Sequence, residues 1–205
     1  MSSSSKNSKE DFKEYQGRVR SLSQSSGEDD ITAVYTKLGK NYDEMMQVVN
    51  YNDPFVLVEA VVNFEEKGLD RENTHFVDFG CGTGVLGREL TKHGFKHFRG
   101  IDATQSLADV ALAAGFYKDV SVMWVGLNDE SFPEKLENSA DVVISAGCFM
   151  KGHFPCEVLD DIYKCCKHDG LIFFSSRDDE FDDNPSGMNY QIKITEMAEE
   201  GKLLR

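Results

Sequence analysis

The stretch that decides the fold is His75-Phe76-Val77-Asp78-Phe79-Gly80-Cys81-Gly82-Thr83-Gly84-Val85-Leu86-Gly87. A short apolar run, typical of a buried strand, leads directly into three alternate glycines and then into a helix-like sequence. Glycine adopts positive φ without steric penalty and has no side chain, so the backbone of this turn can approach a ligand closely. The following helix presents unpaired N–H groups at its N-terminus. We therefore predict a loop that binds a nucleotide-like cofactor.

Two glycine patterns overlap in this loop. Gly82 to Gly87 fits the G-x-G-x-x-G pattern of dinucleotide-binding proteins. Gly80, Gly82 and Gly84 fit the G-x-G-x-G pattern of S-adenosylmethionine enzymes. Asp78 favours the second pattern, because a carboxylate beside the loop would repel a pyrophosphate but suits an ammonium and a sulfonium group.

A second anchor lies downstream of the loop. Phe98-Arg99-Gly100-Ile101-Asp102 reads as a strand that ends in an acid, and Asp102 stands 22 residues after Gly80. An acid about 20 residues beyond such a loop accepts hydrogen bonds from the ribose hydroxyls of the cofactor. The simpler alternative is an aspartate that only caps the following helix.

These motifs resemble those of a known family. The string 77–84 resembles motif I of the class I S-adenosylmethionine-dependent methyltransferases, and 100–104 resembles their G-[IV]-D-x-[ST] element. The resemblance covers the chain from about residue 31 onward. Closer similarity to the Williams–Beuren-region methyltransferase-like group is carried by Tyr42-Asp43, Tyr51-x-x-Pro54, Gly152-His153 and Lys167-x-x-Gly170.

The resemblance implies a fold and a cofactor. The expected fold is α/β, a three-layer α/β/α Rossmann-like sheet that is mostly parallel. The expected cofactor is S-adenosyl-L-methionine, with S-adenosyl-L-homocysteine as product. The family usually adds a sixth and a seventh strand, but beyond the loop that follows the fifth strand only residues 191–205 are left for them here. We expect a helix and the start of strand six there, and hence an incomplete set of C-terminal strands.

Site residues follow from the same resemblance. It places Ala103, Leu127 and Asn128 beside the adenine, with Asn128 either bound to the exocyclic amine or an ordinary loop residue. It also places a carbonyl at Ala146 and Gly147 near the amino group of the donor. Tyr35 and Tyr42 lie on the expected helix that covers this pocket in the family, and they are included as cofactor contacts, although either could instead be a core residue. His153 is the candidate general base, because an imidazole titrates near neutral pH; a loop histidine without a catalytic duty is the alternative. The predicted cofactor-binding residues are Tyr35, Tyr42, Asp78, Gly80, Cys81, Gly82, Gly84, Asp102, Ala103, Leu127, Asn128 and Ala146.

Apolar periodicity predicts strands that alternate with helices, as a doubly wound sheet requires. We expect strands at 75–79, 97–101, 120–125, 141–146 and 171–176, and helices at 31–49, 53–68, 84–93, 105–114 and 155–167. Asp53 is the expected cap of the second helix, with Pro54 at its first position. Residues 1–27 are expected to form a disordered tail, and residues 28–205 a single methyltransferase domain.

Composition limits the partners and the compartment. The net charge is −14, and no basic cluster marks the folded part, which disfavours nucleic acid and anionic membranes. No apolar run reaches the ~18 residues of a membrane helix. The five cysteines suggest reduced thiols and therefore the cytoplasm, with the nucleus as an alternative. We expect a small-molecule substrate or a protein segment as partner.

Other chemistries fit the sequence less well. A Mg²⁺ site of the catechol type would need an acid after strand four, where Ser145-Ala146-Gly147 stands, and adjacent Cys165-Cys166 is not a C-x-x-C pair. We therefore predict no metal. Two alternative functions stay open: a non-catalytic protein that binds S-adenosylmethionine or S-adenosylhomocysteine, and an NAD-dependent oxidoreductase, which Asp78 disfavours.

Overall fold

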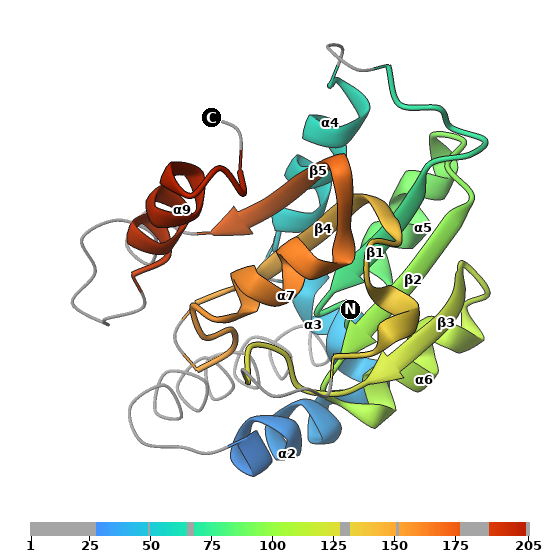
Figure 1. Cartoon of the computed structure of the whole chain (residues 1–205). Coiled ribbons are helices and arrows are strands. Elements are labelled where there is room, and N and C mark those ends of the chain that lie inside the picture. The colour runs from blue at the N-terminus through green and yellow to red at the C-terminus, as the bar shows by residue number, and fades with distance from the viewer. Residues whose placement is uncertain are drawn as a thin grey trace.

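The fold is a single five-stranded parallel sheet covered by helices (Figure 1). A computed structural model describes residues 28–48, 50–64, 68–127, 132–150, 152–176 and 189–203. The strands are β1 (His75–Phe79), β2 (His97–Asp102), β3 (Tyr117–Val122), β4 (Ala140–Phe149) and β5 (Cys166–Ser176). Their spatial order is β3-β2-β1-β4-β5, with all pairs parallel. The order reverses between β1 and β4, and the carboxyl ends of these two strands form the crevice where such sheets bind ligands.

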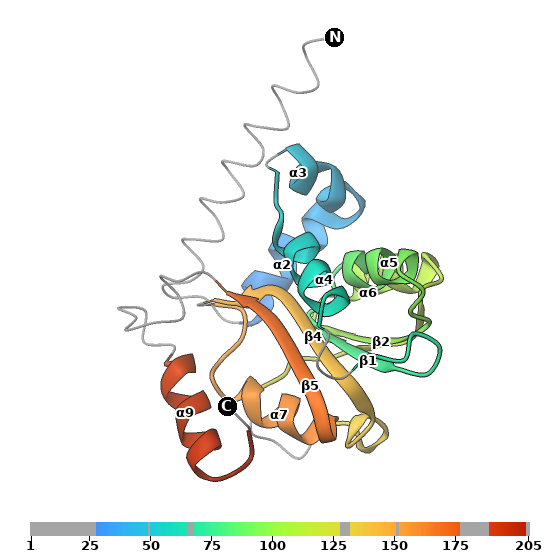
Figure 2. The same ribbon diagram turned by 90° about the horizontal axis from the view of Figure 1, so that it is seen from above.

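Helices cover both faces of the sheet, which confirms the predicted three-layer α/β class (Figure 2). One face carries α4 (Asp53–Val62), α5 (Val85–Lys92) and α6 (Gln105–Ala113), and the other carries α7 (Val158–Cys165) and α9 (Tyr190–Glu199). A short 3-10 helix, η2 (Glu134–Leu136), precedes β4.

The sequence of strand β1 is almost continuously apolar because side chains pack against both of its faces. Phe76 packs with the side chains of α4 and α5, whereas Val77 and Phe79 pack with those of α7 and α9. A parallel strand that is covered on both faces needs apolar residues at successive positions. Asp78 is the exception and is fully buried, so its carboxylate needs a functional or a structural explanation.

β1 and β2 lie within one residue of the predicted ranges, whereas β4 ends three residues later, β5 begins five residues earlier, and β3 is shifted three residues toward the N-terminus. The predicted range 120–125 missed residues 117–119, of which Tyr117 and Asp119 pair with β2. β3 is an edge strand, and charged residues are tolerated on an edge. Asp119 faces Arg99 in register and forms an ion pair with it at 3.4 Å, a contact that no local pattern reveals.

The expected helix 31–49 is interrupted. It consists of α2 (Glu28–Leu38), the 3-10 helix η1 (Gly39–Asn41) and α3 (Tyr42–Val48). Gly39 has φ +42°, a left-handed conformation that an α-helix cannot continue. The predicted cap of α4 is also wrong by one position, because Asn52 is the N-cap and Asp53 the first helical residue.

Three further boundaries differ from prediction. α4 ends at Val62 rather than near Gly68, and α7 spans 158–165 rather than 155–167, because β5 already begins at Cys166. The expected start of a sixth strand is not present within 189–203, where α9 is followed by a turn. The predicted tail, residues 1–27, lies outside the described residues.

Candidate functional site

Two adjoining cavities open at the carboxyl ends of β1 and β4. The larger has a volume of about 530 Å³ and extends from the glycine loop toward α3 and the start of α4. The smaller has about 100 Å³ and extends toward the ends of β2 and β3 and toward α2. Both are lined by Tyr42, Gly80, Gly82 and Ala146, so the predicted loop lies at their junction.

The glycines of the loop serve different purposes. Gly80, Gly82 and Gly84 all have positive φ, at +71°, +53° and +85°. A Cβ on Gly82 would meet no atom within 4 Å, so the backbone of Gly82 borders open space. A Cβ on Gly84 or Gly87 would instead lie 2.9 or 2.6 Å from the Tyr117 ring. The first part of the loop therefore faces the cavities, whereas Gly84 and Gly87 allow the Tyr117 ring to pack closely against the backbone.

Asp78 lies at the wall of the larger cavity with its side chain fully buried. Its Oδ2 accepts a hydrogen bond of 2.6 Å from the Tyr117 hydroxyl, which in turn accepts one of 3.0 Å from the Gly87 N–H. Its Oδ1 has no hydrogen-bond partner among the described residues. Burial raises the pKa of Asp78 to about 7, and the Tyr117 hydroxyl opposes this rise. A buried, unpaired carboxylate oxygen is costly, so this position suits a cationic ligand group.

Asp102 joins the glycine loop to the end of β2. Its Oδ2 accepts a hydrogen bond from the Gly82 N–H and its Oδ1 one from the Thr104 N–H, both at 2.8 Å. Burial raises the pKa of Asp102, and these two hydrogen bonds oppose the rise. Each carboxylate oxygen has a second lone pair, and Asp102 lines the smaller cavity. The carboxylate thus orders the loop and can still accept hydrogen bonds from a ligand.

The far wall of the smaller cavity is formed by α2 and by the loop after β4. The Tyr35 hydroxyl and the His153 Nε2 are 2.6 Å apart in a hydrogen bond, and the two rings meet edge to face. Tyr42 extends this group, with its ring centroid 6.1 Å from that of Tyr35. His153 lines the smaller cavity and is not among the residues that line the larger one, so its catalytic role stays a prediction.

Most of the remaining predicted residues also border the cavities. Cys81 lines the larger one, Ala103 the smaller one, and Ala146 both. Leu127 is 45% exposed and lines neither cavity. Asn128 lies outside the described residues.

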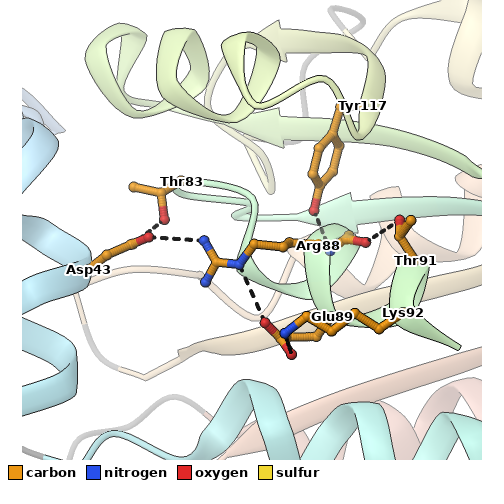
Figure 3. Close-up of polar contacts among 8 residues, drawn as sticks. Asp43, Thr83, Arg88, Glu89, Thr91, Lys92 and Tyr117 are labelled. Carbon is orange, nitrogen blue, oxygen red and sulfur yellow. Dashed lines mark hydrogen bonds and ion pairs between the residues drawn. The ribbon is translucent and has the colours of Figure 1, made fainter.

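A polar clamp that sequence reasoning missed connects α3 to the glycine loop (Figure 3). The Thr83 hydroxyl donates to Asp43 Oδ1 at 2.5 Å, and Arg88 Nη1 lies 3.2 Å from Asp43 Oδ2. Arg88 also lies 3.4 Å from Glu89, which itself pairs with Lys92 at 2.5 Å. Asp43 and Arg88 are about one-third exposed, and such ion pairs contribute little net stability. Their effect is to fix α3 against α5.

The described residues form neither a metal-binding cluster nor a membrane-spanning helix. In that part of the chain, no group of three or more His, Cys, Asp or Glu side chains is arranged so that it could hold a metal ion. Among the described helices, none combines the length and the apolar character needed to span a bilayer.

Comparison with known proteins identifies the family. The sequence profile of a family described as "Methyltransferase domain" matches residues 55–201. Human "Methyltransferase-like protein 27" is 25% identical over 157 residues, which cover 77% of this chain and 60% of that protein. "Ubiquinone biosynthesis O-methyltransferase" of Neisseria meningitidis is 30% identical over 101 residues, 49% of this chain and 42% of that protein. The chain thus spans less than two thirds of the length of these two relatives.

A solved structure shares the fold. The TehB-like S-adenosylmethionine-dependent methyltransferase from Corynebacterium glutamicum superimposes with a TM-score of 0.54 at 21% identity, covering 79% of this chain and 81% of that one. The human relative confirms the predicted similarity to the Williams–Beuren-region group. The chain therefore belongs to the methyltransferase-domain family and has the Rossmann-like fold of the class I S-adenosylmethionine-dependent methyltransferases.

Proposed function

We propose that this chain transfers a methyl group from S-adenosylmethionine to a small acceptor molecule and releases S-adenosylhomocysteine. The observation that carries this proposal is the buried Asp78, whose Oδ1 has no hydrogen-bond partner among the described residues and which lines the larger cavity. An ammonium group would supply the missing donors and a compensating charge. A pyrophosphate at the same place would meet a buried carboxylate and be repelled, which argues against a dinucleotide.

The residues of the two cavities suit the two halves of this cofactor. We assign the amino-acid half to Asp78, Gly80 and Gly82, and the ribose hydroxyls to Asp102. The adenine is assigned to the smaller cavity, beside Ala103 and the segment 123–125. When bound, S-adenosylmethionine supplies a methyl group that its positively charged sulfur has already activated.

The protein then has to hold the acceptor in line and exclude water, and these effects alone can supply much of the acceleration. We retain His153 as the candidate general base. If it accepts the proton of the acceptor, His153→Ala should lower kcat by about 10²–10⁴-fold. Equal kcat at saturating substrate would remove His153 from catalysis.

Two further parts of the proposal concern the acceptor and the compartment. The net charge of −14 fits a small molecule or a basic protein segment better than a nucleic acid. The Neisseria relative is named as an O-methyltransferase of ubiquinone biosynthesis, so an oxygen acceptor is the first class to screen. The cytoplasm is the proposed location.

Ligand-dependent melting tests the proposal. S-adenosylhomocysteine at 100 times its dissociation constant should stabilise the folded chain by about 2.7 kcal/mol. NAD at the same concentration should leave the melting temperature unchanged. The variant Asp78→Asn keeps the size of the side chain but removes its charge, and it should lose most of the stabilisation. A shift with NAD alone would reverse the cofactor assignment, and binding of S-adenosylhomocysteine without turnover of any acceptor would favour the non-catalytic alternative.

A further inference from the structure

The larger cavity extends well beyond the residues assigned to the cofactor. Its outer wall comes from the end of α3, the start of α4 and the connection between them, and is lined by Met46, Gln47, Asn50, Tyr51, Asn52 and Phe55. Its volume of about 530 Å³ lies within the range of about 300–1,000 Å³ that is usual for small-molecule sites. The cavity is therefore large enough for a second ligand group beside the cofactor.

The charges around this cavity are already compensated. The only ionisable side chains among its described lining residues, apart from tyrosine and cysteine, are Asp43, Asp78 and Arg88. Asp43 and Arg88 form an ion pair at 3.2 Å, and Arg88 also meets Glu89. Asp78 is assigned to the amino group of the cofactor. A charged acceptor would thus find no compensating charge here, and desolvation would disfavour it.

The outer wall is aromatic and neutral. Tyr42, Tyr51 and Phe55 present rings, and Phe55 is 47% exposed at the start of α4. Gln47, Asn50 and Asn52 add uncharged amides, which can exchange hydrogen bonds without favouring either sign of charge. This surface suits an apolar, ring-sized molecule with a polar substituent.

Tyr51 brings a hydroxyl to the boundary between the two cavities. Its ring lines the larger cavity, and its hydroxyl lies against Gly147, where a Cβ would overlap it. Gly147 follows directly after Ala146, which lines both cavities at the end of β4. The hydroxyl therefore lies at the junction of the cofactor region and the outer region.

The backbone at this junction is held in place. Gly147 has φ +69°, and its N–H donates a hydrogen bond of 3.0 Å to the Ser175 hydroxyl at the end of β5. Ser175 in turn donates to Asp53 Oδ2 at 3.5 Å, which connects β5 to the first turn of α4. Gly147 is thus a position where only glycine leaves room for the Tyr51 hydroxyl.

We infer that the larger cavity binds the methyl acceptor, that this acceptor is an uncharged molecule with an apolar, ring-sized body, and that the Tyr51 hydroxyl positions its nucleophilic group beside the end of β4. The inference rests on the proposed methyl transfer. Tyr51 acts as a positioning residue through one hydrogen bond to the acceptor.

Three probes that share one naphthalene ring and differ in charge test the charge selectivity. The full chain, saturated with S-adenosylhomocysteine, is titrated with 2-naphthol, 2-naphthoate and 2-naphthylmethylammonium at pH 7.5, and binding is followed by calorimetry and saturation-transfer NMR. We expect 2-naphthol to bind and both charged probes to bind at least about tenfold more weakly, which corresponds to about 1.4 kcal/mol. Equal or tighter binding of either charged probe would overturn the inference, as would no binding of 2-naphthol.

A conservative substitution tests Tyr51. Tyr51→Phe keeps the ring and removes the hydroxyl, so the affinity for 2-naphthol should fall about three- to tenfold, as expected for one hydrogen bond. The affinity for S-adenosylhomocysteine should not change. Tyr163→Phe is the matched control, because Tyr163 is 41% exposed on α7 and lines neither cavity.

The outcomes separate the inference from the proposed function. If Tyr51→Phe weakens S-adenosylhomocysteine and 2-naphthol equally, or weakens neither, the assignment of Tyr51 to the acceptor is wrong. If the wild-type chain does not bind S-adenosylhomocysteine, the proposed function fails and the inference with it.

Discussion

The two cavities share the glycine loop but differ in how fully they are formed. The larger has about 530 Å³ and the smaller about 100 Å³, below the usual range for a ligand site of about 300–1,000 Å³. The hydrogen bond between Tyr35 of α2 and His153 lies in the wall of the smaller one. Under the proposed assignment, the acceptor region is preformed, and we expect the nucleoside region to widen before an adenosine group can enter.

The packing of the covering helices explains which side can move. α4 buries Leu57, Val58 and Val61 against the sheet, and it forms part of the wall of the larger cavity. In α2, by contrast, no side chain from 31 to 38 is fully buried. Elements with few buried apolar contacts open at low free-energy cost. We therefore expect α2, rather than the glycine loop or α4, to move when the cofactor binds.

The first prediction has the largest expected effect and concerns Gly82, which lines both cavities. Gly82→Val places a branched side chain at φ +53°, facing open space at the junction, so it both strains the loop and fills the ligand position. We expect the affinity for S-adenosylhomocysteine to fall by more than about 100-fold, or about 2.8 kcal/mol. Calorimetry on the folded variant provides the measurement.

Gly87→Ala is the comparison for this experiment. A Cβ there would lie 2.6 Å from the Tyr117 ring, so this variant should lower the melting temperature; because the Tyr117 hydroxyl also contacts Asp78, we expect some loss of affinity for S-adenosylhomocysteine, but a smaller one than in Gly82→Val. Tight cofactor binding by a folded Gly82→Val protein would show that the loop does not approach the ligand closely.

The contrast between these two glycines shows what the sequence can predict. The order of the five strands along the chain and the glycine loop follow from local patterns, because their residues are consecutive or regularly spaced. The separate role of Gly87 depends on Tyr117, which lies 30 residues away along the chain. The predicted strand range 120–125 excluded Tyr117, so its hydrogen bond to Asp78 was not predicted.

Contacts between residues that are far apart in the sequence also explain why the rest of the site was not predicted. Asp43 contacts Thr83 and Arg88 across 40 and 45 residues, and Tyr51 meets Gly147 through tertiary packing. Tyr42-Asp43 and Tyr51-x-x-Pro54 carry part of the family resemblance, but spacing alone does not show which groups they meet. The loop geometry around Gly80, Gly82 and Gly84 is local in sequence and could be predicted, whereas the wall that we assign to the acceptor is assembled from distant segments and could not.

The second prediction concerns Asp102, which serves the loop and the smaller cavity together. Asp102→Ala removes the acceptor for the Gly82 and Thr104 N–H groups as well as for the ribose. Hydrogen bonds to a charged group contribute about 1.5–3 kcal/mol, so the affinity for S-adenosylhomocysteine should fall about 10–100-fold. The melting temperature should also fall, because two backbone donors lose their partner.

Asp102→Asn separates these two effects. Its amide oxygen can still accept one of the two backbone hydrogen bonds, so we expect a smaller loss of stability than in Asp102→Ala. Wild-type affinity in a folded Asp102→Ala protein, measured by calorimetry, would place the ribose elsewhere.

The third prediction is a pH dependence on the side of the larger cavity. Burial raises the pKa of Asp78 to about 7, with the carboxylate of Asp102 adding to the rise and the Tyr117 hydroxyl opposing it. A cationic amino group binds the ionised form, so the affinity for S-adenosylhomocysteine should fall about twentyfold from pH 7.5 to pH 5.5. The pH dependence should be much weaker in Asp78→Asn.

The stability of the free protein should change in the opposite direction. The folded state favours protonated Asp78 because its pKa is raised above the value of 3.8 in the unfolded chain. This contribution is present at low pH and is lost as the pH rises through about 7. An affinity that stays constant between pH 5.5 and 7.5 would contradict the contact between Asp78 and the amino group.

The smallest expected effect concerns the closure of the smaller cavity. Tyr35→Phe removes the hydrogen bond of 2.6 Å to His153 but keeps the ring that packs edge to face against it. One net hydrogen bond contributes about 0.5–1.5 kcal/mol, and this pair is only partly buried, so opening should become about threefold more frequent. The association rate of S-adenosylhomocysteine, measured by stopped-flow, should rise by this factor, while binding of 2-naphthol in the larger cavity should not change. Tyr163→Phe on α7 again serves as the control. An unchanged association rate would mean that α2 does not limit entry, and a change in both cavities would mean that they open together.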